Sequence, residues 1–300
     1  MSRKDLNRRT FISSATKVVG SAVLLSNTVI TDAKGRSRDW TVGQIMDLFI
    51  SEVPGAPFAQ TVDTLKSGNR DIKVTGIVTT MFATIDVIRK SIDLNANFII
   101  AHEPTFYNHL DDTSWLENDP VYKYKADLLA THNIAVWRNH DYVHRLKSDG
   151  VRAGVVEKLE WGPHATGPRS SVFKMPPRIL RDLIAEVKQK LGIPTVRYIG
   201  DLSQRFERVL LMPGASGGRN QIAAIGREKP DVVICGEISE WETAEYVRDA
   251  RSKGEKLALI VLGHVASEEP GSKFLADWLT KNVQGVRSTH VPAENSLMFL

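Results

Sequence analysis

The chain has 300 residues, of which 42% are apolar and 25% are charged, a composition typical of a globular protein of one large or two modest domains. This composition excludes a wholly disordered chain, a collagen and a multi-span membrane protein, and the single cysteine excludes an intramolecular disulfide. The net charge is +4, but residues 1–33 hold five basic and only two acidic residues. Bulk charge therefore gives no reason to expect a nucleic-acid partner.

Residues 1–33 carry the features of an export signal in the expected order. Asn7-Arg8-Arg9-Thr10-Phe11-Ile12 resembles the twin-arginine motif, and a weakly apolar stretch centred on residues 18–25 follows it. That stretch is too short and too polar to span a bilayer, and Thr31-Asp32-Ala33 offers small residues for cleavage. We expect a twin-arginine signal peptide, recognition by the twin-arginine export machinery and a periplasmic or other extracytoplasmic location. A basic tail or an uncleaved anchor is the alternative.

After residue 40, apolar strands alternate with amphipathic helices. In the first half the pattern predicts a strand over 74–80, a helix with Ile85, Ile88 and Ile92 on one face, a strand over 98–101, a helix over 121–132 and a strand over 134–137. Residues 148–171 are rich in Gly, Pro and Ser and have little periodicity, which predicts a linker.

The second half repeats this alternation. It predicts a helix with an apolar stripe over 180–191, strands over 208–212, 231–235 and 257–262, helices ending near 227 and covering 241–253 and 272–282, and end strands near 286–291 and 296–300. The pattern indicates an α/β protein with two related halves, 41–147 and 172–300. We expect each half to have a mixed, mostly parallel sheet flanked by helices.

The two halves resemble each other in sequence pattern. One constant shift places Val74 on Arg208 and residues 98–103 on residues 232–237, and a slightly smaller shift matches residues 134–140 to 258–264. Any two βαβ units share part of this pattern, so ordinary similarity is the alternative to duplication. Both halves place a Glu, and later a His, directly after a strand, where ligands bind in α/β sheets.

Histidine and carboxylate side chains, which can bind metal ions, are concentrated after three predicted strands. These segments are His102-Glu103-Pro104, His140-Asp141-Tyr142-Val143-His144 and the segment from His264 to Glu268. Imidazole and carboxylate together suit zinc, iron or manganese. His264 and Glu268 are one helical turn apart and would point the same way at a helix start. Three such clusters indicate a metal site, although a single histidine is usually an ordinary polar residue. We assign that ordinary role to His109, His132, His164 and His290.

Residues 41–300 resemble the type-2 GTP cyclohydrolase I family, also called the Nif-three-like dinuclear-metal hexameric proteins. Residues 235–240 and 263–268 look like the family's C-terminal metal pattern, and residues 74–103 look like its N-terminal pattern. The turn Gly214-Ala215-Ser216-Gly217-Gly218 is similar to the family's glycine-rich turn.

The resemblance implies two divalent transition-metal ions, zinc, iron or manganese, held by His102, Glu103, His144, His264 and Glu268. The sequence departs from the family at two of these positions. Glu103 stands where the family has a second His, and His144 stands where it has an Asp. Asp141 could take the place of His144.

Two further residues have open roles. Glu237 could orient a ligand or bind metal itself. His140 could act as a proton shuttle, because the ordinary imidazole pKa lies near neutrality, or it could be merely structural.

The predicted function is a metal-dependent, cyclohydrolase-like hydrolase of a small substrate, of which a nucleotide is one case. The resemblance also implies a homo-oligomer, specifically a hexamer. One alternative is a non-catalytic metal-binding scaffold or ligand-binding protein. Another is a serine hydrolase, because Ser216 lies in a Gly-x-Ser-x-Gly turn between a strand and a helix.

Overall fold

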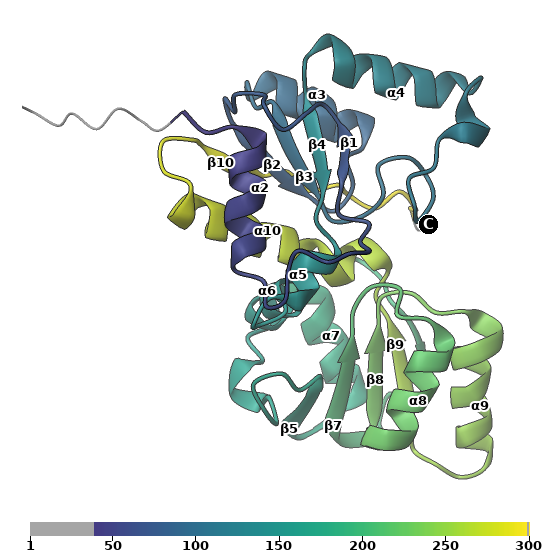
Figure 1. Ribbon diagram of the computed structural model, residues 1–300. Coiled ribbons are helices and arrows are strands. Elements are labelled where there is room, and N and C mark those ends of the chain that lie inside the picture. Colours follow the sequence, from purple (N-terminus) through teal and green to yellow (C-terminus); the bar gives the residue numbers. More distant parts are fainter. Residues whose placement is uncertain (1–38, 299) are drawn as a thin grey trace, which may run out of the picture. The chain divides into compact units, whose positions relative to one another are not determined.

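Two five-stranded sheets with flanking helices organise residues 39–298 and 300, which are the residues that the computed structural model describes (Figure 1). The export signal predicted over residues 1–33 lies outside the described residues. Asp39–Leu300 form one compact unit. Within the described chain, no helix combines the length and the apolar character that crossing a membrane requires.

The first sheet has the strand order β1-β4-β3-β2-β10. Its strands are β1 Leu65–Ser67, β2 Ile77–Thr80, β3 Phe98–Ala101, β4 Ala135–Arg138 and β10 Ser288–His290. All neighbours pair in parallel except β1, which is antiparallel to β4. Every residue of β2, β3 and β4 is buried, because helices cover both faces. Helix α2, Val42–Ser51, packs on one face, and α3, Ile85–Asp93, and α4, Pro120–Thr131, pack on the other.

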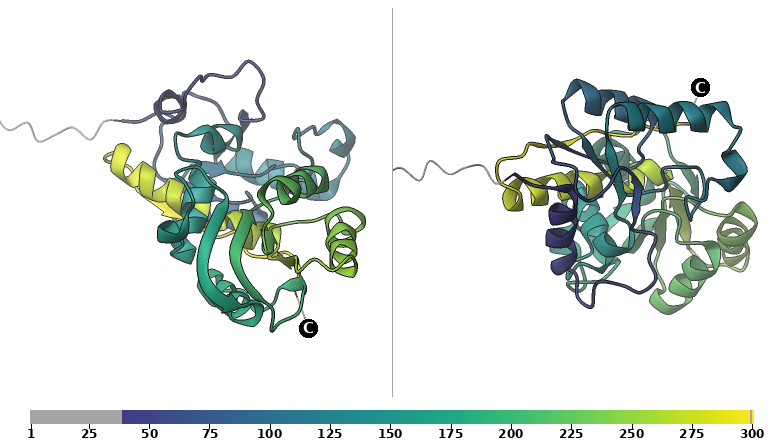
Figure 2. Two further views of the ribbon diagram at one scale, coloured as in Figure 1. Left: turned by 90° about the horizontal axis from the view of Figure 1, so that it is seen from below. Right: turned by 45° about the horizontal axis from the view of Figure 1, so that its top comes forward.

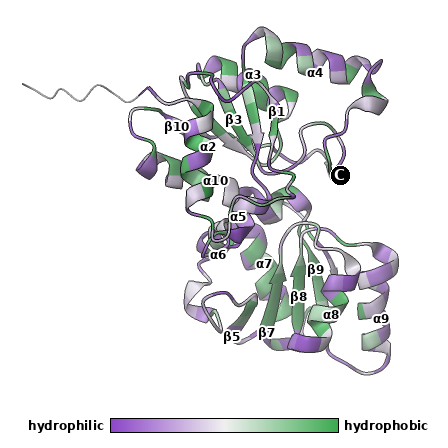
Figure 3. Ribbon diagram, viewed as in Figure 1, coloured by the Kyte–Doolittle hydropathy of each residue, from purple (hydrophilic) through white to green (hydrophobic). Residues whose placement is uncertain are grey.

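The second sheet has the order β5-β7-β8-β9-β6. Its strands are β5 Val172–Ile179, β6 Arg197–Ile199, β7 Arg205–Met212, β8 Val232–Cys235 and β9 Ala258–Val261. The three central strands are parallel and the two edge strands antiparallel. Helix α7, Leu180–Leu191, covers one face, while α8, Gly218–Glu228, and α9, Glu245–Ser252, cover the other. In Figure 3 strands β7 and β8 are green, the colour of apolar residues, whereas α9 at the surface is largely purple, as this layering requires. The predicted α/β class with two mixed sheets is thus confirmed.

Helix α10, His264–Asn282, carries the chain back from the second sheet to the first (Figures 1 and 2). Its residues Leu275 and Leu279 join the core beneath the first sheet, and β10 then pairs with β2. The prediction that 172–300 form the second half did not anticipate this return. The strand predicted near 286–291 exists but belongs to the first sheet, and the strand predicted near 296–300 is absent from the described residues there.

Helix α6, Gly150–Leu159, occupies much of the segment predicted to be a linker, so that prediction was wrong in this respect. The helix packs closely against α10. A Cβ atom added at Gly154 would lie 2.3 Å from the carbonyl oxygen of Pro270. The glycines that permit this approach also weaken the helical pattern in the sequence, which is why the helix was missed.

The central strands of the two sheets repeat the same arrangement. Phe98 and Val232 hold equivalent positions, as the sequence shift predicts. Phe98 pairs with Ile77, and Val232 pairs with Val209, whereas the shift would match Ile77 to Leu211. The third strand is displaced as well, because Phe98 pairs with Ala135 and Val232 with Ala258, one residue off the predicted match. The repeat is therefore real in topology but shifted in register in its first and third strands.

Candidate metal centre

The predicted ligands follow the carboxyl ends of three parallel strands. His102 and Glu103 directly follow β3, and the turn after β4 leads through His140 into helix α5, Asp141–Arg145. After β9, α10 begins at His264, with Glu268 one turn further on. The carboxyl edges of parallel strands are where α/β proteins bind ligands. Here the first turn of α10 lies where the carboxyl edges of the two sheets meet.

Carboxylates and imidazoles from both halves meet at this point. The Nε2 atom of His264 lies 3.3 Å from Oε1 of Glu103 and 3.0 Å from Oε2 of Glu268. Nε2 of His102 lies 3.4 Å from the same oxygen of Glu268. His102, Glu103 and Glu268 are all buried, and their ligand atoms lie within 4.8 Å of one another. The predicted orientation of His264 and Glu268 on one helix face agrees with this geometry.

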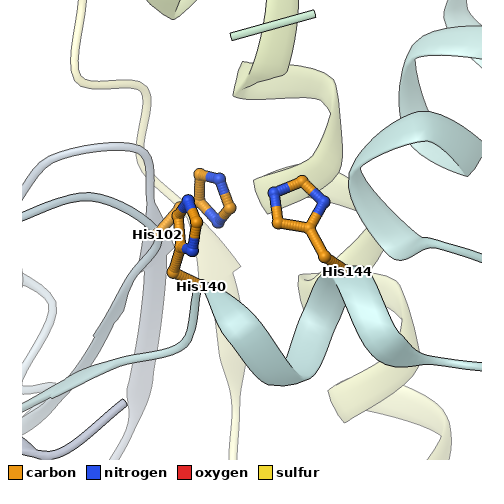
Figure 4. A group of neighbouring side chains, drawn as sticks. All are labelled: His102, His140 and His144. Atoms are coloured by element: carbon orange, nitrogen blue, oxygen red, sulfur yellow. The ribbon is translucent and has the colours of Figure 1, made fainter. Parts of the chain in front are cut away.

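Three histidines form a second group around the same His102. The ring centroids of His102, His140 and His144 lie 4.8 to 5.1 Å apart, and one nitrogen of each lies within 4.8 Å of the others. Figure 4 shows the His102 and His140 rings beside each other, with His144 across from them. His140 is therefore part of the cluster itself, whereas the sequence assigned it only a proton-transfer or structural role.

Each histidine of the centre has an acceptor at Nδ1. Such a partner holds the proton on Nδ1 and fixes the ring, and in a neutral ring it leaves the Nε2 lone pair for a metal, as is common for metal-binding histidines. Nε2 of His264 instead faces Glu103 and Glu268. The acceptors are the Asn139 carbonyl oxygen for His102 at 3.3 Å, Asp141 for His140 at 3.0 Å, Asp149 for His144 at 3.0 Å and Glu237 for His264 at 2.9 Å.

Asp141 and His144 differ in whether they keep an atom available to bind a metal ion. One Asp141 oxygen contacts His140, and the other accepts hydrogen bonds from the Thr61 hydroxyl and the Val62 amide. Among the described residues, the His144 ring forms a hydrogen bond only through Nδ1, and it belongs to the three-histidine group.

Burial and neighbouring charges set the ionisation of the centre. Burial alone would raise the pKa of Glu103, but a hydrogen bond from His264 and electrostatic attraction to His102 and His264 lower it overall. The pKa of Glu268 is lowered strongly against burial by the imidazoles of His102 and His264. Burial opposes the charged form of His264, but Glu103 and Glu268 raise its pKa to about 10. Both carboxylates are therefore ionised at neutral pH.

His140 has the opposite behaviour. Burial and the neighbouring charge of His102 lower its pKa to about 4, although Asp141 acts in the other direction. At pH 7 this ring is neutral, which is the state in which an imidazole binds metal.

Three residues that sequence reasoning missed hold the cluster. Asp63 is buried and accepts the backbone N–H groups of residues 140–142 at 2.7 to 3.0 Å. Arg138 is fully buried and donates to Oε2 of Glu103 at 3.3 Å and to the backbone carbonyl of His102 at 3.4 Å. Asp149 begins α6 as its N-cap and also holds His144. Only Asp149 had a local signal, as a capping residue before a helix.

The glycine-rich turn after β7 gives Glu268 its room. A Cβ atom at Gly214 would lie 2.2 Å from Oε1 of Glu268, and the backbone there has a φ of +67°. The amide of Gly214 donates to the Ser267 hydroxyl at 2.9 Å. Ser216 accepts a hydrogen bond from Gln221 at 3.3 Å, and among the described residues no histidine contacts its hydroxyl.

A pocket of about 650 Å³ opens beside the three-histidine group. The loop 55–60 and the residues His140, His144 and Arg145 line it. The guanidinium of Arg145 lies 5.4 Å from the centroid of the Phe58 ring, and Phe58 stacks on Tyr142. Within the described chain Arg145 forms no ion pair, so its N–H groups remain available to a ligand.

Comparison with known proteins shows which family the chain resembles in sequence. Residues 58–296 match the model of the Duf34/NIF3 (NGG1p interacting factor 3) family. A relative from Clostridium acetobutylicum, named a GTP cyclohydrolase 1 type 2 homolog, is 25% identical over 248 residues, which are 78% of this chain and 87% of the relative. A relative of the same name from Clostridium perfringens is 23% identical over 216 residues, covering 69% and 78% of the two chains.

Solved structures share the fold. A Staphylococcus aureus protein is similar with a TM-score of 0.68 and 18% identity, covering 87% of this chain and 99% of its own. A Bacillus cereus protein related to NIF3 has the same TM-score with 16% identity, covering 87% of this chain and 98% of its own.

Proposed function

The chain belongs to the Duf34/NIF3 family, and we propose that it is a metal-dependent hydrolase with a two-metal centre that acts on a small molecule. The observation that carries this proposal is the buried group of His102, Glu103 and Glu268, whose ligand atoms lie within 4.8 Å of one another. His144 and His264 complete the ligand set that the sequence predicts.

The donor groups fit a divalent cation. Nε2 of His102 is buried and forms no hydrogen bond with any described residue. A buried polar atom without a hydrogen bond is costly, and a divalent cation bound to this nitrogen, beside the two ionised carboxylates, would supply a partner. Mixed imidazole and carboxylate donors suit zinc, iron or manganese.

Two adjacent divalent ions activate water and stabilise negative charge that develops on a substrate during hydrolysis. The residues of this chain prepare the site for that chemistry. Glu237 orients His264 by accepting from its Nδ1. Arg138 holds Oε2 of Glu103, so that Oε1 remains directed towards His264.

The neighbouring pocket supports a small substrate. Its volume of about 650 Å³ is in the usual range for small-molecule sites. Arg145 offers a cation to a carboxylate or phosphate group. The relatives are named for GTP cyclohydrolase, and ring opening of a purine nucleotide is one reaction that this centre and pocket would serve. Other small hydrolysable substrates fit equally well.

Export and assembly complete the proposal. The Arg8-Arg9 motif and the apolar stretch after it support export by the twin-arginine route, which carries folded, cofactor-loaded proteins. The family resemblance supports a homohexamer. Export also supports the second candidate, a non-catalytic metal-binding scaffold, because GTP is scarce outside the cytoplasm.

Metal content of the purified protein tests the centre first. We expect about two transition-metal ions per chain, and loss of them in the His264→Ala/Glu268→Ala variant. The matched control is His290→Ala/Glu269→Ala, because this pair joins the same residue types at 2.7 Å outside the centre. Absence of metal from the wild-type protein, even after reconstitution, would overturn the proposal.

Turnover of a substrate panel then separates the hydrolase from the scaffold. A hydrolase gives turnover that depends on the bound metal, and a scaffold binds metal without turnover. Ser216→Ala leaves a metal-dependent reaction intact but abolishes a serine-hydrolase reaction.

A further inference from the structure

We infer that His140 is a metal ligand and that His102, His140 and His144 form an all-nitrogen subsite for one of the two ions. The inference rests on the proposed metal centre and goes beyond it by assigning the ligands of each ion. Nitrogen atoms of these three rings lie within 4.8 Å of one another.

The orientation of the rings supports this assignment. Nδ1 of His140 faces Asp141 at 3.0 Å, and Nδ1 of His144 faces Asp149 at 3.0 Å. Nδ1 of His102 faces a backbone carbonyl. Each ring thus uses Nδ1 for this acceptor and leaves Nε2 for metal. Nε2 of the buried His102 has no hydrogen-bond partner among the described residues, and the nearest carboxylate oxygens lie 3.4 Å from it, on Glu268, and 3.8 Å from Nε2 of His140, on Glu103. Carboxylate or carbonyl acceptors behind all three rings are the usual second layer of a metal site.

The turn that carries His140 is also held rigidly. Asp63 accepts the backbone N–H groups of residues 140, 141 and 142. Both oxygens of Asp141 are engaged, one by His140 and the other by Thr61 and Val62. Asp141 therefore supports His140 as a hydrogen-bond acceptor, and His144 supplies the donor atom at the far end of the turn.

His102 determines how the donors divide between the ions. It belongs to both the three-histidine group and the group with Glu103 and Glu268. Because its Nδ1 faces a carbonyl oxygen, only one nitrogen is available, and one imidazole nitrogen binds one ion. With His102 in the all-nitrogen subsite, the second ion is left with Glu103, Glu268 and His264. The two subsites then differ in chemistry, because imidazole-only donors favour zinc, copper or nickel over manganese.

Titration with Co²⁺ alone tests this division, because the visible absorption of bound Co²⁺ reports its ligands. Zinc stoichiometry by elemental analysis is measured in parallel. We expect His140→Ala to lower the count from about two ions to about one and to remove one component of the Co²⁺ spectrum. Glu268→Gln should remove the other component and retain the first. His109→Ala is the control, since that ring lies 6.4 Å from His140 and outside both groups.

His140→Gln is made beside His140→Ala, and thermal unfolding of the metal-free proteins identifies a variant that has lost its fold. Retention of two ions and of an unchanged Co²⁺ spectrum in a folded His140 variant would overturn the inference and leave the proposed metal centre standing. Loss of both spectral components in Glu268→Gln would overturn the separate subsites. A wild-type protein that binds no Co²⁺ would overturn the metal centre and the inference together.

Discussion

Gly214 shows how a single residue without a side chain creates space for a ligand. Any Cβ atom there would lie 2.2 Å from Oε1 of Glu268, and the positive φ of +67° adds strain for any other residue. The glycine-rich turn that resembles a serine-hydrolase motif in the sequence is therefore better explained as room for a buried carboxylate.

Gly214→Ala should displace Glu268 and lower the metal content of the protein. The control is Gly192→Ala, where φ is also positive at +71° but no atom lies within 4 Å of the added Cβ. The left-handed conformation disfavours alanine, so Gly192→Ala should lose about 1 to 2 kcal/mol in the free energy of unfolding. Gly214→Ala should lose more, because its Cβ also clashes with a buried side chain. Only Gly214→Ala should lose metal, measured by elemental analysis. Equal metal content in the two variants would show that Glu268 tolerates the displacement.

The sequence predicts some residues of the site and not others, for a physical reason. His102 and Glu103 stand directly after an apolar strand, and His264 begins the helix that follows another, with Glu268 one turn further on. Their positions therefore follow from local pattern and sheet geometry. Asp63 and Arg138 act through contacts with residues that are distant in the sequence, and no local motif predicts these contacts. The role of such a buried polar residue depends on the completed fold.

At the scale of elements, α6 and α10 approach each other through glycine. Gly154→Ala would place Cβ 2.3 Å from the carbonyl oxygen of Pro270, which is backbone and cannot rotate away. We expect a loss of about 1 to 3 kcal/mol in unfolding free energy by chemical denaturation, as for other overpacked sites. Gly226→Ala in the exposed part of α8 is the control, since nothing lies within 4 Å. It should be neutral or stabilising by up to about 1 kcal/mol. Equal effects would mean that the helices separate at little cost.

The sequence predicts the end of α10 but not where this helix begins. The sequence predicts a helix over 272–282, but α10 begins at His264. Pro270 lies inside it and is usually a sign that a helix ends. The backbone at Pro270 and Gly271 packs directly against Gly154 and Val151 of α6, and that contact is not visible in the sequence.

Helix α4 carries a buried lysine whose ionisation should make stability depend on pH. Burial lowers the pKa of Lys125 from 10.5 to about 8, although Asp111 opposes the shift, and its Nζ donates to the Thr105 carbonyl. Between pH 8 and 10.5 the unfolded chain binds more protons at this site than the folded protein, so stability rises with pH. We expect the wild type to gain up to about 3 kcal/mol relative to Lys125→Met across this range in denaturant titrations. A difference that stays constant with pH would mean that Lys125 titrates normally in the folded protein.

At the scale of the whole molecule, the two sheets share one helix and one candidate site. Ala266, near the start of α10, belongs to the core of the second sheet, whereas Leu275 and Leu279 belong to the core of the first. The sequence predicts two related halves but not this connection, because a short strand such as β10 carries no local sign of the sheet it will join. The candidate ligands also come from both halves, with His102 and Glu103 on one side and His264 and Glu268 on the other.

This arrangement should make residues 39–300 unfold as a single cooperative unit, because separating the halves would expose the apolar face of α10. Hydrogen exchange measures this directly at the buried amides of β3 and β8. We expect both sets to open with the same free energy, and both to gain equally when metal is added. A metal at one hundred times its Kd adds about 2.7 kcal/mol to a two-state unit. The halves would be separate folding units if β8 opened at lower free energy than β3, or if metal protected only one of the two strands. Helix α10 would then connect the halves without forming a shared core.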